Sequence, residues 1–214
     1  MRFSLVIFDM DGTLVDTDLM IVLSYVDMYR KFRPGYKVSV TKLLSFSGPP
    51  LASVLPVEFP DVPYAEALAY FRKVCRHYYD ETVYAYPGVK EVLIELKKRG
   101  IKTAVVTSKL REESLYTLKI TGLEGLFDLV IASDDVTSSK PNPEGVFKAM
   151  SDLGVDNKNA VLYIGDTRYD DETANNAGIP CMLVTWTPRP FPAECKPRYR
   201  LDSWKDFFEV VENG

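Results

Sequence analysis

Runs of consecutive apolar residues, rather than alternating apolar and polar ones, constrain the fold of this chain more than any other feature. The first run extends from Phe3 to Phe8, with Ser4 as its one polar residue, and four more follow after residue 87. Strands that are buried on both faces of a parallel sheet have this continuous apolar pattern. We therefore predict an α/β protein with a doubly wound, Rossmann-like parallel sheet. The later strands are predicted at Thr103–Val106, Leu129–Ala132, Val161–Ile164 and Met182–Val184.

Helical patterns separate most of these runs, as a doubly wound sheet requires. Val89, Val92 and Leu96 recur at helical spacing, and Gly100 follows them as a stop signal. Similar signals predict three more helices: one closing near Gly122, one opening at Asn142-Pro143 and one ending at Gly178.

Residues 16–85 lack this alternation and are expected to form a helical cap domain. Two apolar stripes at helical spacing lie there, one from Leu19 and one from Leu68. The turn Ser47-Gly48-Pro49-Pro50 and a proline-rich stretch separate the two stripes. Residues 1–15 and 86–214 then form the α/β core domain into which the cap is inserted.

Charge and cysteine content narrow the classes of partner. The 214 residues carry a formal net charge of -4, whereas proteins that bind nucleic acid usually present a basic face. No apolar segment approaches the length of a membrane span, and Asp9 and Asp11 interrupt the N-terminal run. Three scattered cysteines are typical of free thiols in a reducing cytosol. We therefore expect a cytoplasmic protein, monomeric or homodimeric, with no nucleic-acid or membrane partner.

The segment Asp9-Met10-Asp11-Gly12-Thr13 follows the first apolar run directly. Two carboxylates two residues apart at a strand end point to the same side. One carboxylate can attack phosphorus while the other transfers protons, and both can lie near one divalent cation. A simple turn is the alternative, because Asp, Gly and Thr are ordinary turn residues.

Polar residues also follow the later strands, and in doubly wound sheets ligands bind at this carboxyl edge. Hydroxyl and amide groups of Thr107 and Ser108 are suited to phosphoryl oxygens, although polar residues also simply terminate strands. Lys140 precedes a predicted helix and would neutralise phosphoryl charge, although most lysines in loops are only solvated. Asp166 and the later Asp170 offer the oxygen ligands that Mg²⁺ prefers, and Asp170 or Asp171 could instead cap the next helix.

In order along the chain, these four sites resemble the motifs of the haloacid dehalogenase (HAD) superfamily. The resemblance covers nearly the whole chain, since this superfamily places its helical cap between the first and second motifs. It implies that Asp9 is the nucleophile and Asp11 the general acid and then base. It also implies that phosphoryl oxygens are bound by Thr107, Ser108 and Lys140, and that Mg²⁺ is held by Asp9, the Asp11 carbonyl and Asp166, with Asp170, or alternatively Asp171, as the supporting acid.

In this superfamily the cap sets substrate specificity, and the sequence says less about the cap than about the core. Ser47-Gly48-Pro49-Pro50-Leu51 resembles a turn of phosphoglycolate phosphatases and related bacterial pyrophosphatases, although an ordinary helix–helix turn explains it equally well. The resemblance implies a Mg²⁺-dependent phosphatase that hydrolyses a small phosphate monoester of the phosphoglycolate type, or pyrophosphate, through an aspartyl-phosphate intermediate. A β-phosphoglucomutase-like phosphomutase and a non-catalytic HAD-fold binding protein are the alternatives. Dehalogenation is not expected, because the dehalogenase branch lacks the second aspartate.

Overall fold

The computed structural model describes residues 2–213 and divides into two compact units. Of these residues, 2–15 and 85–213 form one unit, and 16–84 form the other. Strands β2 (Val15–Asp16) and β3 (Tyr84–Ala85) lie where the chain passes from one unit to the other, and they pair in a two-stranded sheet. Each unit is described by itself below.

The larger unit is built on a six-stranded sheet in the order β5-β4-β1-β6-β7-β8. Every neighbouring pair of these strands is parallel. In β1, Leu5 lies between Lys102 and Val161 of the adjacent strands, which fixes the register of the centre of the sheet. The expected doubly wound α/β fold is therefore confirmed. The strands are β1 (Leu5–Phe8), β4 (Lys102–Val106), β5 (Leu129–Ile131), β6 (Val161–Gly165), β7 (Cys181–Val184) and β8 (Tyr199–Leu201).

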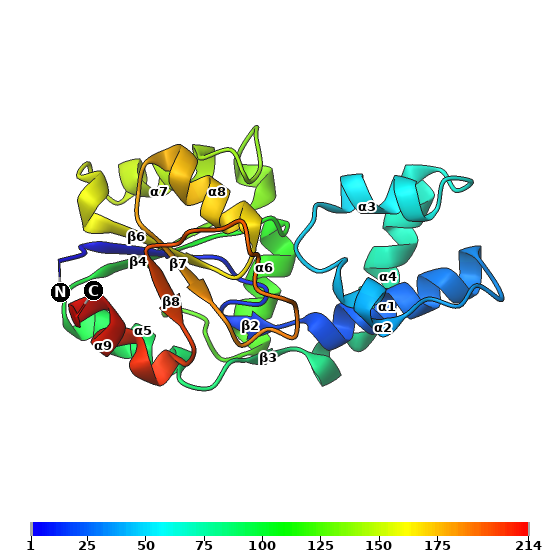
Figure 1. The fold of residues 1–214 in the computed structure, drawn as a ribbon, viewed down its shortest axis with the longest axis horizontal. Coiled ribbons are helices and arrows are strands. Elements are labelled where there is room, and N and C mark those ends of the chain that lie inside the picture. Colours follow the sequence, from blue (N-terminus) through cyan, green and yellow to red (C-terminus); the bar gives the residue numbers. More distant parts are fainter. Residues whose placement is uncertain (1, 214) are drawn as a thin grey trace. The chain divides into compact units, whose positions relative to one another are not determined.

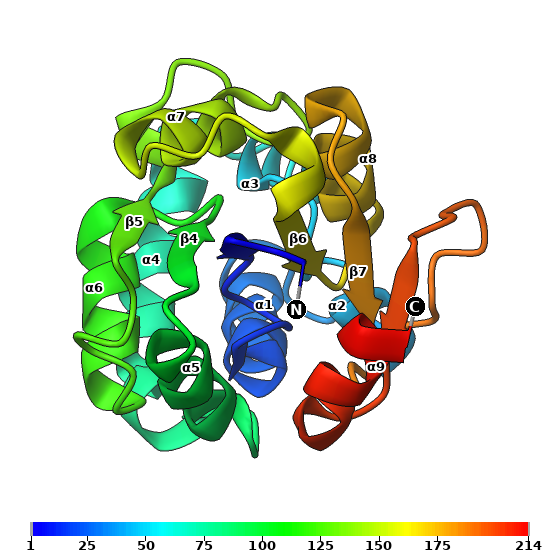
Figure 2. The same cartoon turned by 90° about the vertical axis from the view of Figure 1, so that its left-hand side faces the viewer.

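Helices cover both faces of this sheet (Figures 1 and 2). On one face, α7 (Glu144–Asp152) and α8 (Arg168–Ala177) pack against the strands. Leu5 and Ile7 belong to the buried cluster on this side, whereas the Phe8 ring lies 5.9 Å from the Trp204 ring on the other. Successive side chains of β1 thus enter opposite layers, which is why its sequence has no polar position. The remaining helices of the unit are α5 (Val89–Lys98), α6 (Arg111–Ile120), α9 (Phe207–Asn213) and the short 3-10 segments η1 (Ser133–Asp135), η2 (Lys158–Ala160) and η3 (Trp204–Asp206).

Strand β8 is the main addition to the sequence-based expectation for this unit. No strand was predicted between Val184 and Ser203, yet Tyr199–Leu201 pairs with β7 at the edge of the sheet. Only three residues long, the strand carries the exposed Arg200 between two buried neighbours. It therefore lacks the continuous apolar run that marks the other strands.

The smaller unit is helical, with α1 (Asp18–Phe32) packed against α4 (Tyr64–Thr82). The Tyr25 ring at its centre lies 4.5 Å from that of Phe46 and 5.0 Å from that of Phe71. Between the long helices, where only a turn and a proline-rich stretch were expected, the chain forms α2 (Val40–Leu44) and α3 (Leu51–Glu58). Pro56 lies inside α3.

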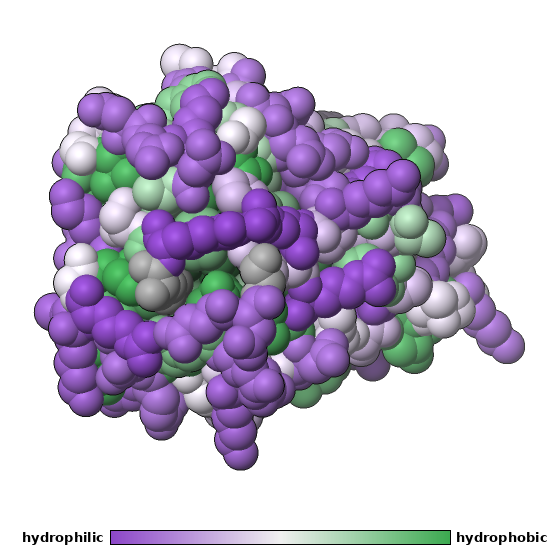
Figure 3. Space-filling view, turned by 60° about the vertical axis from the view of Figure 1, so that its left-hand side comes forward, coloured by the Kyte–Doolittle hydropathy of each residue, from purple (hydrophilic) through white to green (hydrophobic). Residues whose placement is uncertain are grey.

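Hydrophilic side chains dominate the face shown in Figure 3, with smaller hydrophobic patches between them. Cys75, Cys181 and Cys195 are buried free thiols. Within residues 2–213, no helix combines the length and the hydrophobicity needed to cross a bilayer.

Candidate active site

The parallel order of the sheet brings most of the predicted site residues to one edge. Strands β4, β1 and β6 are neighbours, and Thr107, Asp9 and Asp166 follow them directly. The backbone amide of Asp9 donates to Ile164 O at 2.8 Å, and that of Thr107 donates to Ile131 O at 3.0 Å. Strand pairing therefore continues up to the first polar residue and fixes the backbone from which each side chain extends.

Lys140 is buried between two of the predicted carboxylates. Its Nζ lies 2.7 Å from Asp9 Oδ1 and 2.7 Å from Asp170 Oδ1. The side chain of Lys140 is only 8% exposed and that of Asp170 is fully buried. The two carboxylates offset the cost of removing this ammonium from water.

The Asp170 carboxylate accepts hydrogen bonds from several neighbouring residues. Its Oδ1 accepts from Lys140 and, at 3.2 Å, from the Tyr163 hydroxyl. Its Oδ2 accepts from the amides of Asp166 and Thr167 and, at 2.7 Å, from the Thr167 hydroxyl. These five donors occupy the acceptor positions of the carboxylate, so Asp170 caps α8 and orients Lys140 at the same time.

Gly165 and Asp171 differ in their relation to the Asp170 side chain. A Cβ at Gly165 would overlap the Asp170 side chain, so the close approach of β6 requires a glycine there. Asp171, the alternative supporting acid, accepts from Asn175 Nδ2 at 3.1 Å and is not part of the cluster formed by Asp9, Asp166 and Asp170. The geometry therefore favours Asp170 for the supporting role.

Burial and charge shift the proton affinities of these groups in opposite directions. Burial raises the pKa of Asp9 to about 8, because the nearby Lys140 offsets desolvation and the repulsion from Asp170 only in part. Burial also raises the pKa of Asp166 to about 7, against the lowering effect of Arg189. Burial alone would raise the pKa of Asp170, but Lys140 and the hydrogen bonds from Thr167 lower it below its usual value. The pKa of Lys140 rises despite burial, since Asp170 and Asp9 attract its charge.

The same carboxylates fit a divalent cation. Asp9, Asp166 and Asp170 are buried, and their nearest oxygens all lie within 4.8 Å of one another. Oxygen ligands of this kind suit Mg²⁺. The raised pKa values of Asp9 and Asp166 indicate that two buried carboxylates lack sufficient positive charge around them. Because Asp170 is already surrounded by donors, Asp9 and Asp166 are the side chains best placed to bind the metal directly.

Asp11 has a partner that the sequence analysis did not anticipate. Lys109 Nζ lies 2.7 Å from Asp11 Oδ1 and 2.8 Å from Oδ2. The Asp11 side chain is 27% exposed, and it is not part of the carboxylate cluster described above. The feature of the sequence that could have indicated this contact is the position of Lys109, two residues after Thr107 and just past the end of β4.

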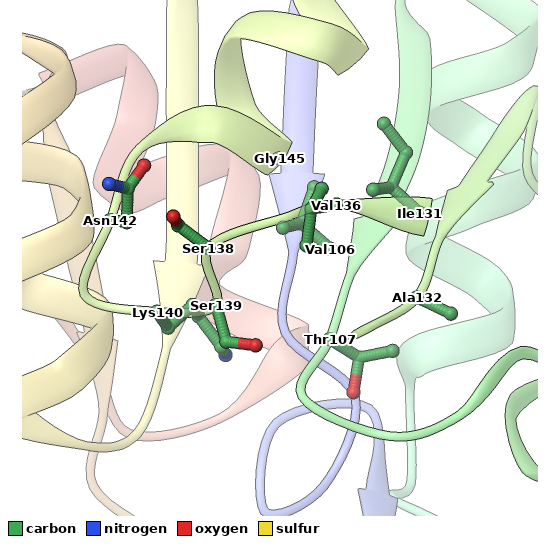
Figure 4. A pocket seen from close by; sticks show the side chains of 10 residues that line it. All are labelled: Val106, Thr107, Ile131, Ala132, Val136, Ser138, Ser139, Lys140, Asn142 and Gly145. Carbon is green, nitrogen blue, oxygen red and sulfur yellow. The ribbon is translucent and has the colours of Figure 1, made fainter. Parts of the chain in front are cut away.

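The two predicted hydroxyl residues have different surroundings. Thr107 is buried, and its Oγ1 accepts from the Lys109 amide at 3.2 Å, whereas Ser108 is exposed. Figure 4 shows a small pocket with Thr107 and Lys140 on its wall. The loop after β5 contributes Ser138 and Ser139 to the same pocket. Thr107 and Lys140 therefore line the same pocket, as two residues that bind one phosphoryl group must.

Arg189, for which the sequence required no role, forms an ion pair with Asp166. Its side chain is 11% exposed and comes from the segment after β7. The backbone of Gly12 packs against this pair, so that a Cβ at Gly12 would overlap both Asp166 and Arg189. With φ at +81°, Gly12 also has a backbone conformation that favours glycine. Thr13 Oγ1 donates to Asp166 Oδ1 at 3.3 Å from the same turn.

Replacing Arg189 with glutamine should destabilise the metal-free protein. The change leaves Asp166 buried without its cation, which costs up to about 3 kcal/mol of unfolding free energy. Partial proton uptake by Asp166 limits the cost, since its pKa is already about 7. Thermal or urea unfolding in the presence of EDTA measures the effect.

Arg198→Gln is the matched control, because Arg198 is an exposed arginine of the same segment. We expect that variant to unfold within about 0.5 kcal/mol of the wild type. Equal stability of both variants would show that the Arg189–Asp166 pair contributes nothing to the metal-free state.

Comparison with known proteins agrees with the fold and the motifs. The family model for haloacid dehalogenase-like hydrolases matches residues 6–184. Pyrophosphatase PpaX from Halalkalibacterium halodurans is 34% identical over 213 residues, covering 99% of this chain and 98% of that protein. Pyrophosphatase PpaX from Bacillus velezensis is 36% identical over 215 residues, covering 98% and 97%.

A solved structure shows the same fold at lower sequence similarity. It is described as a predicted phosphoglycolate phosphatase from Haemophilus somnus and has a TM-score of 0.79 with 24% identity, covering 99% of both chains. The expected phosphatase of the HAD superfamily is confirmed at this level. The chain belongs to the haloacid dehalogenase-like hydrolase family.

Proposed function

We propose that this chain hydrolyses pyrophosphate, or a small phosphate monoester of the phosphoglycolate type, through a phosphorylated Asp9 in the presence of Mg²⁺. The observation that carries the proposal is the buried cluster of Asp9, Asp166 and Asp170 around Lys140. Buried carboxylates with strongly shifted pKa values are costly for folding and are typical of catalytic sites.

In the first half-reaction, a carboxylate oxygen of Asp9 forms a bond to phosphorus and the bond between phosphorus and the leaving oxygen breaks. Lys140 lies against Asp9 and reduces the repulsion between the attacking carboxylate and the phosphoryl oxygens. Asp11, on the same strand end, gives its proton to the leaving oxygen. The product of this step is an acyl phosphate on Asp9.

In the second half-reaction, water attacks the phosphorus of the acyl phosphate. The bond between phosphorus and the Asp9 oxygen breaks, and its electron pair returns to the Asp9 carboxylate. Asp11 now accepts a proton from the attacking water. Thr107 contributes its hydroxyl to the phosphoryl oxygens throughout, from the wall of the pocket in Figure 4.

Asp9, Asp166 and the backbone carbonyl of Asp11 would hold Mg²⁺, with Asp170 as the supporting residue. When bound, the cation supplies the positive charge that favours ionised Asp9 and neutralises the phosphoryl oxygens. The Arg189 side chain, paired with Asp166 in this structure, would then share that carboxylate with the cation.

Pyrophosphate is the first substrate to test. The two proteins named pyrophosphatase PpaX that are described above are 34% and 36% identical to this chain over nearly their whole length. The turn from Ser47 to Leu51 resembles both the pyrophosphatase and the phosphoglycolate phosphatase branches, so phosphoglycolate is the matched competitor.

Phosphate release from pyrophosphate, phosphoglycolate and p-nitrophenyl phosphate should be measured with Mg²⁺ and again with excess EDTA. We expect release from all three with Mg²⁺ and none with EDTA. For pyrophosphate, kcat/KM should exceed that for phosphoglycolate by at least about tenfold, a difference of about 1.4 kcal/mol in transition-state binding. Equal kcat/KM values for the two substrates, or a higher value for phosphoglycolate, would assign the chain to the monoester branch.

Two outcomes would contradict the proposal itself. Undiminished hydrolysis in EDTA would remove the metal from the mechanism. Isomerisation of a sugar phosphate without net phosphate release would identify a phosphomutase instead.

A further inference from the structure

Lys109 forms an ion pair with Asp11, the proposed acid and base, although the proposed reaction gives Lys109 no role. Both Asp11 oxygens accept from the Lys109 ammonium, at 2.7 Å and 2.8 Å. The Lys109 side chain is only 11% exposed. Ordering a lysine side chain to this degree costs conformational entropy. The contact is therefore more restrictive than an ordinary surface ion pair.

The backbone of Lys109 is fixed as well. Its amide donates to Thr107 Oγ1 at 3.2 Å, and its carbonyl accepts from the Ser133 amide at 2.8 Å. The first bond lies within the end of β4, and the second joins the ends of β4 and β5. The ammonium is thus presented to Asp11 from a position that two neighbouring strands define.

The Lys109 ammonium donates to both oxygens of Asp11, and this two-point contact suits a carboxylate better than a carboxyl group that carries a proton on one oxygen. The carboxylate is the form that accepts a proton from water in the second half-reaction. In the first half-reaction, Asp11 must instead carry a proton, and Lys109 holds that form less firmly. The two half-reactions therefore differ in their need for Lys109.

We propose that Lys109 is a positioning residue that holds Asp11 as the base for hydrolysis of phosphorylated Asp9, an inference that rests on the proposed function. Water attacks phosphorus, the bond from phosphorus to the Asp9 oxygen breaks, and the proton from water moves to Asp11 oriented by Lys109. Lys109 itself forms no bond to the reacting atoms.

This role predicts a specific kinetic pattern for Lys109→Met. With p-nitrophenyl phosphate, whose leaving group departs without a proton, formation of the acyl phosphate should continue at the wild-type rate. Its hydrolysis should slow by about 10–100-fold, the usual effect of losing a residue that orients a functional group. Hydrolysis of the acyl phosphate then limits kcat, so kcat and KM should fall together. The ratio kcat/KM depends on formation of the acyl phosphate and should change by less than about threefold.

Rapid mixing followed by an acid quench tests the pattern directly. Lys109→Met should show a burst of p-nitrophenol approaching one per active site, with the same amount of trapped acyl phosphate. Lys109→Arg, which keeps a cation with parallel donors, should restore part of kcat. Lys119→Met is the matched control, because Lys119 is an exposed lysine on the following helix α6, and it should behave as the wild type.

The outcomes separate this inference from the proposed function. Asp11→Asn should also accumulate acyl phosphate with p-nitrophenyl phosphate. If Asp11→Asn accumulates it and Lys109→Met does not, the positioning role is wrong while the acyl phosphate stands. An equal fall of kcat and kcat/KM in Lys109→Met would likewise overturn the role. If no variant ever traps an acyl phosphate, the proposed function fails and the role of Lys109 fails with it.

Discussion

Replacing Asp9 with asparagine is expected to lower phosphate release by at least about 10⁴-fold, the scale seen when a residue of a covalent catalytic unit is removed. The amide has nearly the shape of the carboxylate but cannot attack phosphorus. Steady-state hydrolysis of p-nitrophenyl phosphate with Mg²⁺ measures the loss, and no acyl phosphate should be trapped after an acid quench.

The same substitution should leave the fold intact. Burial and repulsion from Asp170 and Asp166 already oppose a charge at Asp9, whose pKa is raised to about 8. A neutral amide removes that buried charge, and Lys140 keeps its second carboxylate at Asp170. We therefore expect an unchanged or higher unfolding temperature, as is common when a strained catalytic group is removed.

Asp152→Asn is the control for loss of a carboxylate elsewhere, because Asp152 is exposed on α7. It should retain full activity. Activity within tenfold of the wild type in Asp9→Asn, after intact mass has excluded reversion to aspartate, would contradict nucleophilic attack by Asp9.

The sequence predicts the central strands of the sheet and the residues that follow them for one physical reason. A strand buried on both faces must be apolar throughout, so the change to Asp9, Thr107 or Asp166 marks where it ends. Parallel pairing then brings these ends together without further information. Edge strand β8 has no such mark, because the exposed Arg200 interrupts it.

The partners of the site residues were harder to predict, because they depend on the path of loops. Lys140 could be assigned only through the resemblance, since a lysine in a loop is usually exposed. Arg189 lies 23 positions beyond Asp166, and nothing in its proline-rich surroundings indicates where the side chain points. Lys109 follows β4 closely enough to be placed at the right edge, but its contact with Asp11 requires atomic geometry.

Helices α2 and α3 were missed because their signals are weak. The first is five residues long, and Val40 in its first turn is exposed. The second begins after Pro50 and contains Pro56, which removes one hydrogen-bond donor from the helix. Both depend on packing within the helical unit rather than on intrinsic helix propensity.

Replacing Lys140 with methionine should give the largest loss of stability among the site variants. Removing this ammonium leaves the fully buried Asp170 and the buried Asp9 facing one another without a cation. Breaking a buried ion pair from one side costs about 3–5 kcal/mol. Urea unfolding of the metal-free protein measures the change, and activity should be lost as well because Lys140 lies against the attacking carboxylate.

Lys148→Met is the matched control on the neighbouring helix α7. Lys148 pairs with Asp152 at 3.1 Å, but the two side chains are 44% and 39% exposed. Solvent screens such a pair, so its loss should change the unfolding free energy by less than about 1 kcal/mol. Comparable losses in the two lysine variants would mean that burial does not strengthen the contribution of Lys140.

A double-mutant cycle identifies which carboxylate requires the cation. Asp170→Asn removes the charge to which Lys140 and the hydrogen bonds from Thr167 are fitted. In that background, Lys140→Met should cost less than in the wild type, with a coupling energy of about 1–3 kcal/mol. Since Asp9 favours its neutral form more than Asp170 does, the coupling of Lys140 to Asp9 should be smaller. If Asp9 and Asp170 proved equally coupled, Asp170 would not be the group that fixes Lys140 in the site.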